Sequence, residues 1–416
     1  MSDHLILTLN CGSSSLKAAL IHSSSGLPLM SCLAERLNTP EASITVKYFE
    51  PEGVYPSGRE SWFYGKSGGD KHEAELGSRN DHRSVVEVLF EELESHGLHG
   101  LVAAAGHRVA HGGEKYSESV LADDAVMAAV EECCALAPLH NPANLAGIRA
   151  VQQVFPGLPN AAVFDTSFHQ TMPDYAYRYA VPERLYREHG IRRYGFHGTS
   201  YRYVAAEAAK ILGKPLEQCA LVIAHIGNGA SVCAVKNGKS MDTSMGVTPL
   251  EGLVMGTRSG DLDPGIFSIL ADNAGMDTRA VTDLLNKQSG LLGLSGLSND
   301  CRTLQEAAAE GHEGAALALE TMSYRLAKYI AAMAVAADGL DAVVFTGGIG
   351  ENSDIVRAKT LGRLKVLGLE TDPEANLAVR FGKAGRISKS EHPAALVVPT
   401  NEERMIAQDT AALAGL

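Results

Sequence analysis

The amino-acid sequence predicts an α/β fold built from two similar halves. Apolar runs of strand length alternate with helical segments along the chain, which is the pattern of an α/β protein. In addition, one pattern occurs twice: residues 5–20 read LILTLNCGSSSLKAAL, and residues 221–235 read LVIAHIGNGASVCAV. Each stretch has an apolar run, a turn of polar and small residues, and a second apolar run, which predicts two equivalent β-hairpins.

The turn of the first hairpin carries groups that suit an anion. Its backbone N–H groups and three serine hydroxyls point into the bend, and oriented N–H donors form a concavity for phosphate oxygens. Lys17 adds a positive charge, and the side-chain oxygen of Asn10 can orient a hydrated Mg²⁺. An ordinary hairpin with a polar turn explains this stretch equally well by itself. The second hairpin, with its turn at 225–230, favours a duplicated fold that closes on one nucleotide.

The remaining elements are predicted from periodicity, caps and breakers. A third glycine-rich turn, Gly347–Asn352, follows an apolar run and leads into a helix from Ser353, an arrangement that favours negative charge. Residues 44–83 are expected to form a weakly defined hairpin or flap, and the capping-box pattern Ser84–Glu87 predicts a helix to about His96. The other expected strands are 100–105, 161–164 and 395–398, and the other expected helices are 123–137, 313–338, one from Pro142, one from Tyr201 and one at 403–416.

Composition limits the class of protein. A chain of 416 residues, with 45% hydrophobic and 20% charged residues, is long enough for two domains with ample cores. The net charge of −13 disfavours a nucleic-acid or anionic-membrane surface, so an anionic substrate needs locally concentrated Arg, Lys and His. Seven cysteines without a CxxC pair predict reduced thiols, and no export signal or long apolar run is visible. We therefore expect a cytoplasmic protein without nucleic-acid or membrane partners.

Five candidate functional residues lie in glycine- or proline-rich loops at strand ends, where open α/β sheets bind ligands. They are Arg108, His140, Asp165, His197 and Arg258. A structural role is the simpler interpretation of any one of them. Five such residues in the same kind of strand-end loop, however, favour a functional site.

Common nucleotide and metal motifs do not fit. Residues 65–67 and 238–240 end like a Walker A loop but lack its first glycine, and 227–229 lacks the third glycine of a dinucleotide loop. His107 and His111 have metal-ligand spacing, yet Arg108 replaces the glutamate of HExxH, which disfavours zinc.

Several long motifs give the chain a resemblance to the acetate kinases, the acetokinase group of the sugar kinase/Hsp70/actin superfamily. The motifs are NCGSSSLK at 10–17, HRVAHGG at 107–113, PLHNP at 138–142, FDTSFH at 164–169, YGFHGTS at 194–200, HIGNGAS at 225–231, GTRSGDLDP at 256–264, GGIGEN at 347–352 and PTNEE at 399–403. The resemblance covers essentially the whole chain. It implies a homodimer and a duplicated, ribonuclease H-like two-domain fold with the active site in the interdomain cleft. We expect residues 1–164, joined by helix 403–416, on the acyl-substrate side and residues 165–402 on the nucleotide side.

The resemblance also implies a role for each motif. Asp165 would be the active-site carboxylate, and His197 and Arg258 would stabilise the transition state. Asn10 and Glu402 would hold Mg²⁺, which Mn²⁺ can replace. The acyl substrate would contact Arg108, Ala110, Leu139, His140, Phe196 and Pro249. ATP, the co-substrate, would contact Lys17, His225, Ile226, Gly227, Asn228, Gly229, Asp300, Cys301, Arg302, Gly348, Ile349, Gly350, Glu351 and Asn352.

Two positions depart from the family pattern. Tyr201 stands where the family usually has histidine after GTS, a change that we expect to be harmless. Ala110 stands where acetate-preferring members commonly carry valine, and the smaller side chain leaves room for a longer acyl chain. Propionate kinase activity is therefore the alternative to acetate kinase activity.

The chemistry implied is reversible transfer of the ATP γ-phosphoryl group to acetate, giving acetyl phosphate and ADP. A carboxylate acceptor is already ionised near neutral pH and needs no strong base, whereas arginines offset the repulsion between two anions. This favours direct in-line transfer, with Asp165 orienting the metal or an arginine, and a phosphorylated carboxylate is the alternative. A hydroxyl-directed kinase and a non-catalytic nucleotide switch are the rival functions, but neither accounts for Arg108 and Arg258 together.

Overall fold

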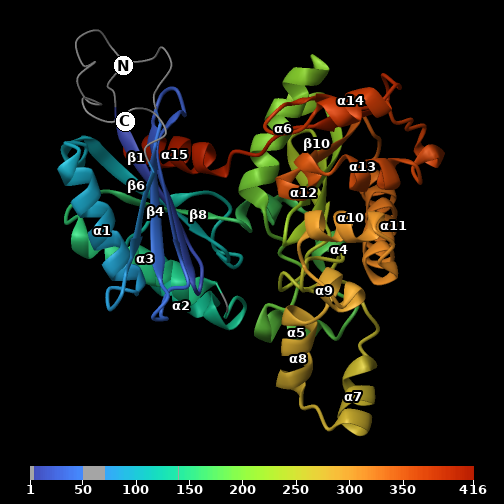
Figure 1. Cartoon of the computed structure of the whole chain (residues 1–416), viewed down its shortest axis with the longest axis horizontal. Helices are drawn as coiled ribbons and strands as arrows, with labels where there is room; N and C mark the ends of the chain where they lie inside the picture. Colours follow the sequence, from blue (N-terminus) through green and yellow to red (C-terminus); the bar gives the residue numbers. More distant parts are fainter. Residues whose placement is uncertain (1–3, 50–70, 139) are drawn as a thin grey trace. The chain divides into compact units, whose positions relative to one another are not determined.

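The structure, a computed structural model, describes residues 4–49, 71–138 and 140–416. The chain divides into two compact units, each built on one sheet (Figure 1). The N-terminal unit comprises residues 1–167 and 401–416, and the C-terminal unit comprises residues 168–400. The predicted α/β architecture is confirmed.

The sheet of the N-terminal unit has the strand order β5-β4-β3-β2-β1-β6-β8-β7. Its strands are β1 (Leu5–Cys11), β2 (Ser15–His22), β3 (Pro28–Glu35), β4 (Ser43–Tyr48), β5 (Lys71–Glu75), β6 (Val102–Val109), β7 (Val120–Leu121) and β8 (Asn160–Phe164). Its helices are α1 (His82–Ser95), α2 (Asp124–Glu132), α3 (Asn141–Val154) and α15 (Glu402–Leu413).

The sheet of the C-terminal unit has the order β11-β10-β9-β12-β14-β13. Its strands are β9 (Ala220–Ile226), β10 (Ala230–Lys236), β11 (Lys239–Thr243), β12 (Ala342–Thr346), β13 (Gly385–Arg386) and β14 (Ala394–Val397). Its helices are α4 (Asp174–Tyr177), α5 (Glu183–His189), α6 (Gly198–Leu212), α7 (Ile266–Ala274), α8 (Thr278–Lys287), α9 (Gly290–Ser295), α10 (Cys301–Ala309), α11 (Glu313–Ala336), α12 (Gly347–Asn352), α13 (Asp354–Leu361) and α14 (Pro373–Ala378).

The two sheets share one topology, as the duplicated hairpin predicts. Strands β1 and β2 are antiparallel, β2 pairs with β3, and β6 joins the other side of β1 in parallel. Strands β9, β10, β11 and β12 repeat this pattern strand for strand, since β9–β10 and β10–β11 are antiparallel and β12 is parallel to β9. Strands β8 and β14 then extend each sheet in parallel. Both central strands are apolar on both faces because helices cover them.

The C-terminal helix α15 packs on the sheet of the N-terminal unit, against β1 and β6 (Figure 1). Gly106 in β6 permits this close approach, because a Cβ there would lie 2.2 Å from Thr410 Oγ1 and 2.6 Å from Ile406 Cγ2. The last helix therefore carries its first residue, Glu402, back to a unit formed mainly by the start of the chain.

One local prediction is wrong, and another can be checked only in part. Helix α1 starts at His82 rather than Ser84, because Asp81 is the N-cap and its Oδ1 accepts a hydrogen bond of 2.8 Å from the Ser84 N–H. The predicted hairpin at 44–83 contains the antiparallel pair β4–β5, whereas residues 50–70 lie outside the described part.

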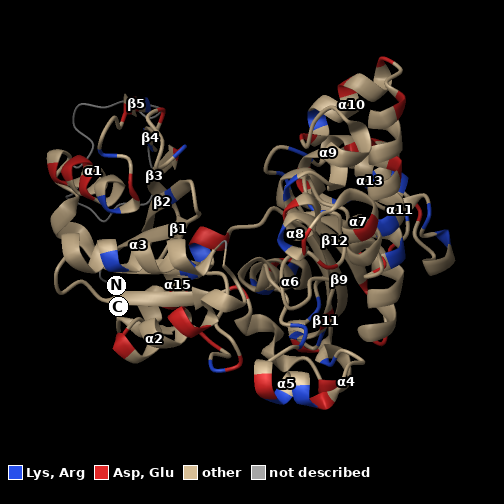
Figure 2. Ribbon diagram, turned by 90° about the horizontal axis from the view of Figure 1, so that it is seen from below, with Lys and Arg blue, Asp and Glu red and all other residues tan. Residues whose placement is uncertain are grey.

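Charges of both signs are interspersed along helices of each unit, α1, α5 and α11 among them (Figure 2). Helix α5, for example, carries Glu183, Arg184, Arg187 and Glu188 within two turns. This pattern differs from the one-sided basic face of a nucleic-acid-binding helix. Within the described residues, we find no helix with the length and apolarity needed to span a bilayer.

Candidate active site

The ends of β6 and β8 bring together an arginine and a carboxylate in the N-terminal unit. Arg108 lies near the end of β6, and Asp165 directly follows β8, its parallel neighbour. The Arg108 Nε atom donates to both Asp165 carboxylate oxygens at 3.0 and 3.2 Å, and Nη2 donates to Oδ2 at 2.6 Å. The Arg108 side chain is 24% exposed and Asp165 is 1% exposed, so the pair is anchored in the protein and open on the arginine side.

Electrostatics keep this arginine charged. Burial alone would lower the pKa of Arg108, but the charge and hydrogen bonds of Asp165, with the charge of Glu402, raise that pKa above its ordinary value. A planar guanidinium held through two of its nitrogens presents its remaining donors in a defined direction. Its Nη1 atom donates to Asn10 Oδ1 at 3.2 Å, which extends the cluster to the first hairpin.

A pocket of about 180 Å³ lies over these groups within the N-terminal unit. Its lining includes five predicted site residues, which are Asn10, Lys17, Arg108, Ala110 and His140. Cys11, Gly12, Ser15 and Asn144 complete the lining. Asn144 orients two loops, because its Oδ1 accepts from the Ala110 N–H at 3.0 Å and its Nδ2 donates to Cys11 O at 2.7 Å. Leu139, another predicted pocket residue, lies outside the described residues.

Glu402 adds a second acidic group to the N-terminal cluster. Its carboxyl pKa is raised, first by desolvation and then by the charge of Asp165, while Arg108 and Lys17 oppose the rise. Its Oε1 atom is buried and has no hydrogen-bond partner within the described chain. A buried carboxylate oxygen without a donor is suited to a cation, which would remove the cost of its desolvation.

The donor set fits a hard divalent cation that keeps part of its water. Asn10 and Glu402 supply only oxygen, the ligand type that Mg²⁺ prefers. No cluster of three or more His, Cys, Asp and Glu with metal-binding geometry is present in residues 4–49, 71–138 and 140–416. His107, which the HxxxH spacing singled out, is buried and bonded at 2.7 Å to Asn160, and burial lowers its pKa to about 4.

In the C-terminal unit, His197 and Arg258 approach the turn of the second hairpin. A Cβ added at Gly229 would lie 3.5 Å from Arg258 Nη1 and 3.7 Å from His197 Nε2. Arg258 Nη1 also donates to Pro249 O at 3.3 Å. The Arg258 loop is fixed against α9, since Gly290 has φ +62 and a Cβ there would lie 2.2 Å from Met255 O. The Arg258 guanidinium and the His197 imidazole thus both face the turn of small residues at Gly229.

His197 has an unusual backbone and a fixed ring. It is the N-cap of α6 and has φ 59, in the left-handed region that few residues other than glycine adopt. Its ring stacks on His225 with a centroid distance of 4.2 Å, and its Nδ1 lies 2.8 Å from Ser231 Oγ. The predicted acyl contact Phe196 is 3% exposed and belongs to the core of this unit.

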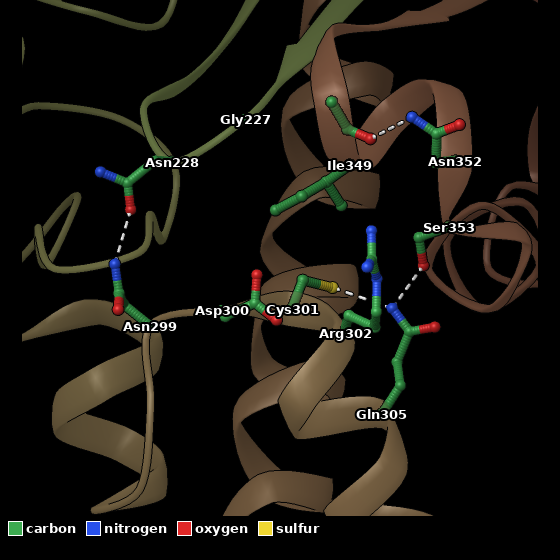
Figure 3. A pocket seen from close by; sticks show the side chains of 11 residues that line it. Gly227, Asn228, Asn299, Asp300, Cys301, Arg302, Gln305, Ile349, Asn352 and Ser353 are labelled. Carbon is green, nitrogen blue, oxygen red and sulfur yellow. Dashed lines mark hydrogen bonds between the residues drawn. The ribbon is translucent and has the colours of Figure 1, made fainter. Parts of the chain in front are cut away.

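A larger pocket of about 450 Å³ lies between the second hairpin, α10 and α12 (Figure 3). Its lining contains eight of the predicted ATP contacts, which are Gly227, Asn228, Asp300, Cys301, Arg302, Gly348, Ile349 and Asn352. The Ile349 side chain supplies an apolar surface, and Arg302 supplies a planar cation of the kind that stacks on bases. This combination suits a nucleoside.

Some predicted ATP contacts do not line this pocket. Ile226 and Gly350 are buried, and His225 and Gly229 lie beside His197. Glu351 uses its Oε1 to accept from the Gly347 N–H at 2.9 Å and the Thr400 N–H at 3.1 Å, so it braces the strand-end loop. Lys17 lies in the pocket of the N-terminal unit instead.

Three lining residues were absent from the sequence prediction, namely Asn299, Gln305 and Ser353. Asn299 donates to Asn228 Oδ1 at 3.1 Å, and Gln305 donates to Ser353 Oγ at 2.9 Å (Figure 3). Asn299 precedes the predicted residue Asp300, so adjacency was the available signal. Gln305 lies one helical turn after Cys301, and a helix prediction with that periodicity is needed to find it.

Comparisons with known proteins identify the family of this chain. The model of the acetokinase family matches residues 5–408. Acetate kinase 1 and acetate kinase 2 of Neisseria meningitidis serogroup B are 60% and 62% identical to this chain over the full length of both proteins. The crystal structure of Porphyromonas gingivalis acetate kinase is 43% identical with a TM-score of 0.89, covering 99% of each chain. A propionate kinase from Francisella tularensis is also 43% identical, with a TM-score of 0.90 and coverage of 99% and 100%.

The family assignment rests on the sequence and on the fold. The sequence matches the family model over nearly all of its length, and the fold superimposes on solved members over nearly every residue. Membership implies ATP as co-substrate, a divalent metal and a short-chain carboxylate acceptor. This chain belongs to the acetokinase family.

Proposed function

We propose that this protein is an acetate kinase, which transfers the γ-phosphoryl group of MgATP to acetate and yields acetyl phosphate and ADP. The observation that carries the proposal is Arg108, charged and anchored on Asp165 at the wall of a small pocket. An arginine fork suits a carboxylate substrate, whereas a sugar hydroxyl needs a free base at that place. Asp165 is already engaged by Arg108, so its role is to orient the arginine.

The residues of each unit then take distinct roles. Arg108 binds the acetate carboxylate, and Ala110 and His140 line the same pocket. Arg302 and Ile349 hold the nucleoside, and the backbone N–H groups of Asn228 and Gly229, in the turn of the second hairpin, donate to the phosphates. His197 and Arg258 donate to the transferring phosphoryl group, where charge spreads over three oxygens in the transition state. The carboxylate attacks directly because it is already ionised.

Mg²⁺ is the proposed metal, with Asn10 and Glu402 as its protein contacts, directly or through water. When bound, it neutralises phosphate charge and orients the phosphoryl group. A cytoplasmic location and a homodimer are part of the same proposal, and gel filtration tests the dimer. The chemical test of the function is incubation with MgATP, acetate and hydroxylamine, which converts acetyl phosphate to acetohydroxamate. Hydroxamate formation supports the proposal, whereas phosphorylation of a polyol in place of acetate, or ATP binding without any turnover, contradicts it.

Changing the metal ligands is expected to raise the Mg²⁺ requirement. In Asn10→Ala and Glu402→Gln, half-maximal activity should need more Mg²⁺, while kcat at saturating Mg²⁺ falls less, because the ion keeps most of its other ligands. Mg²⁺ titrations of activity at fixed ATP measure this. Glu94→Gln, on an exposed face of α1, is the matched control. Unchanged titrations in both variants would place the metal elsewhere.

The role of Glu402 can also be tested without measuring activity, through the stability of the protein. Its folded-state pKa lies above the ordinary value of 4.5, so the free energy of unfolding falls as the pH rises through that raised pKa. Glu402→Gln should therefore raise Tm of the metal-free protein at pH 7, and Mg²⁺ should raise Tm of the parent more than that of the variant. A Tm for metal-free Glu402→Gln below that of the parent at pH 7 would contradict this account.

The acyl pocket predicts the substrate range. Ala110 is 5% exposed in the wall that also holds Arg108 and His140, and a valine there adds two methyl groups. We expect propionate to be a good second substrate, and Ala110→Val to lower the ratio of kcat/KM for propionate over that for acetate about tenfold. Both substrates are measured on both proteins at saturating MgATP. Ala122→Val, at a buried alanine outside the pocket, is the control. An unchanged ratio would mean that Ala110 does not contact the acyl chain.

A further inference from the structure

A buried hydrogen-bond chain leads from Tyr201 to the catalytic candidate His197. Tyr201 lies in the first turn of α6, and Ser231 lies in β10, and both are 0% exposed. The Tyr201 hydroxyl lies 2.5 Å from Ser231 Oγ, and Ser231 Oγ lies 2.8 Å from His197 Nδ1. All three residues belong to the C-terminal unit. The chain is therefore independent of the placement of the N-terminal unit.

The direction of the protons along this chain follows from counting donors and acceptors. Burial first, and the nearby Cys233 second, raise the pKa of Tyr201 well above 10, so its hydroxyl keeps its proton at neutral pH. In the described part of the chain, Ser231 Oγ is the acceptor within reach of the tyrosine proton. A buried hydroxyl left without an acceptor is costly, so Tyr201 donates to Ser231.

The Ser231 hydroxyl has a single proton, and the hydrogen bond that it accepts from Tyr201 determines where this proton points. Because Ser231 Oγ accepts from Tyr201, it is free to donate to His197 Nδ1. Nδ1 of a neutral imidazole that accepts a hydrogen bond carries no proton, so the ring proton lies on Nε2. Nε2 is the nitrogen that faces Gly229 and the Arg258 guanidinium. Stacking on His225 fixes the ring plane in this orientation.

We propose that Tyr201 is a positioning residue that acts through Ser231 to hold His197 as the Nε2–H tautomer, a neutral donor aimed at the transferring phosphoryl group. The tautomer assignment rests on the hydrogen-bond geometry and on the protonated Tyr201 hydroxyl, and its effect on turnover rests on the proposed function. The other tautomer would present a lone pair to an anionic group and would repel it. We therefore expect Tyr201 to orient His197 in addition to packing in the core.

The direct test is the tautomer of His197, measured by NMR on the full-length protein with ¹⁵N-labelled histidine. The signals of His197 are assigned by their loss in His197→Gln. Protonated and unprotonated ring nitrogens have well separated ¹⁵N shifts, so the spectrum shows which nitrogen carries the proton. The parent should carry it on Nε2, and Tyr201→Phe and Ser231→Ala should move the two shifts toward an average of both tautomers. Tyr203→Phe removes a hydroxyl two residues along the same helix and should leave the spectrum unchanged.

Kinetics give the second readout. Tyr201→Phe should lower kcat about tenfold, the worth of one hydrogen bond, with the KM values for ATP and acetate nearly unchanged. Because Tyr201 acts through Ser231, the double variant should be no slower than Ser231→Ala alone. A purely structural role would instead lower Tm and leave the tautomer unchanged. A parent proton on Nδ1, or a Tyr201→Phe spectrum like that of the parent, overturns the proposal even if acetate turnover is confirmed. If acetate is not a substrate, the spectrum still decides the tautomer.

Discussion

Replacing Arg258 by alanine is expected to lower kcat by about 10³–10⁵ while the affinity for ATP stays nearly unchanged. The Arg258 guanidinium lies beside the hairpin turn and beside His197, outside the lining of the pocket of about 450 Å³ that is proposed to bind the nucleoside. Its proposed contact is with charge that develops on the phosphoryl group in the transition state, so its loss affects turnover more than ground-state binding. Steady-state kinetics and calorimetric titration with a non-hydrolysable ATP analogue measure the two quantities separately.

Two further variants sharpen this test. Arg258→Lys keeps the charge but loses the planar donor fork, so it should recover only part of the rate. Arg279→Ala removes an exposed arginine on α8 of the same unit and should leave kcat unchanged. A kcat of Arg258→Ala within tenfold of the parent would remove Arg258 from the catalytic group. A large loss of ATP affinity would make it a nucleotide-binding residue instead.

Asp165→Asn is expected to affect both stability and catalysis. Asparagine keeps the shape but removes the charge that the Arg108 guanidinium contacts through two nitrogens. Removing one partner of a buried pair lowers the free energy of unfolding by about 3 kcal/mol, because the other charge stays behind. The arginine would also lose its orientation, so kcat/KM for acetate should fall by more than a hundredfold. Urea unfolding and initial rates measure the two effects.

The N-terminal unit offers a matched control for this pair. Arg79 and Glu91 form the same two-nitrogen contact at 2.8 and 3.1 Å, but on the surface, with side chains 43% and 60% exposed. Glu91→Gln should lower the free energy of unfolding by less than about 1 kcal/mol. If Asp165→Asn were as mild as this control in both assays, Asp165 would not be the group that positions Arg108.

Much of the fold was predictable because its signals are local. The two hairpins have apolar runs of strand length around turns of small residues, and both form as predicted, with Asn10 opposite Lys17 and Ala230 opposite Ile226. The strand before Gly347 and the helix after Ser353 follow from the same reasoning, whereas residues 347–352, which we expected to form a turn, form the short helix α12. The predicted start of α1 was wrong because the capping-box pattern at Ser84–Glu87 pointed to a cap at Ser84, whereas the backbone turns into the helix three residues earlier, at Asp81.

The candidate site was likewise predictable where it depends on local sequence and unpredictable where it depends on long-range contacts. The sequence by itself determined which loops follow strand ends, and therefore that Arg108 and Asp165 lie at one edge of a sheet. Only the tertiary structure decided that these two side chains bond to each other, that α15 returns Glu402 to the same cluster, and that the Tyr201 hydroxyl reaches Ser231. Strand and helix periodicity is a property of neighbouring residues, so it can be read along the chain. Hydrogen bonds between residues 30 or 57 positions apart depend on strand register and helix packing, which arise only when the whole unit folds.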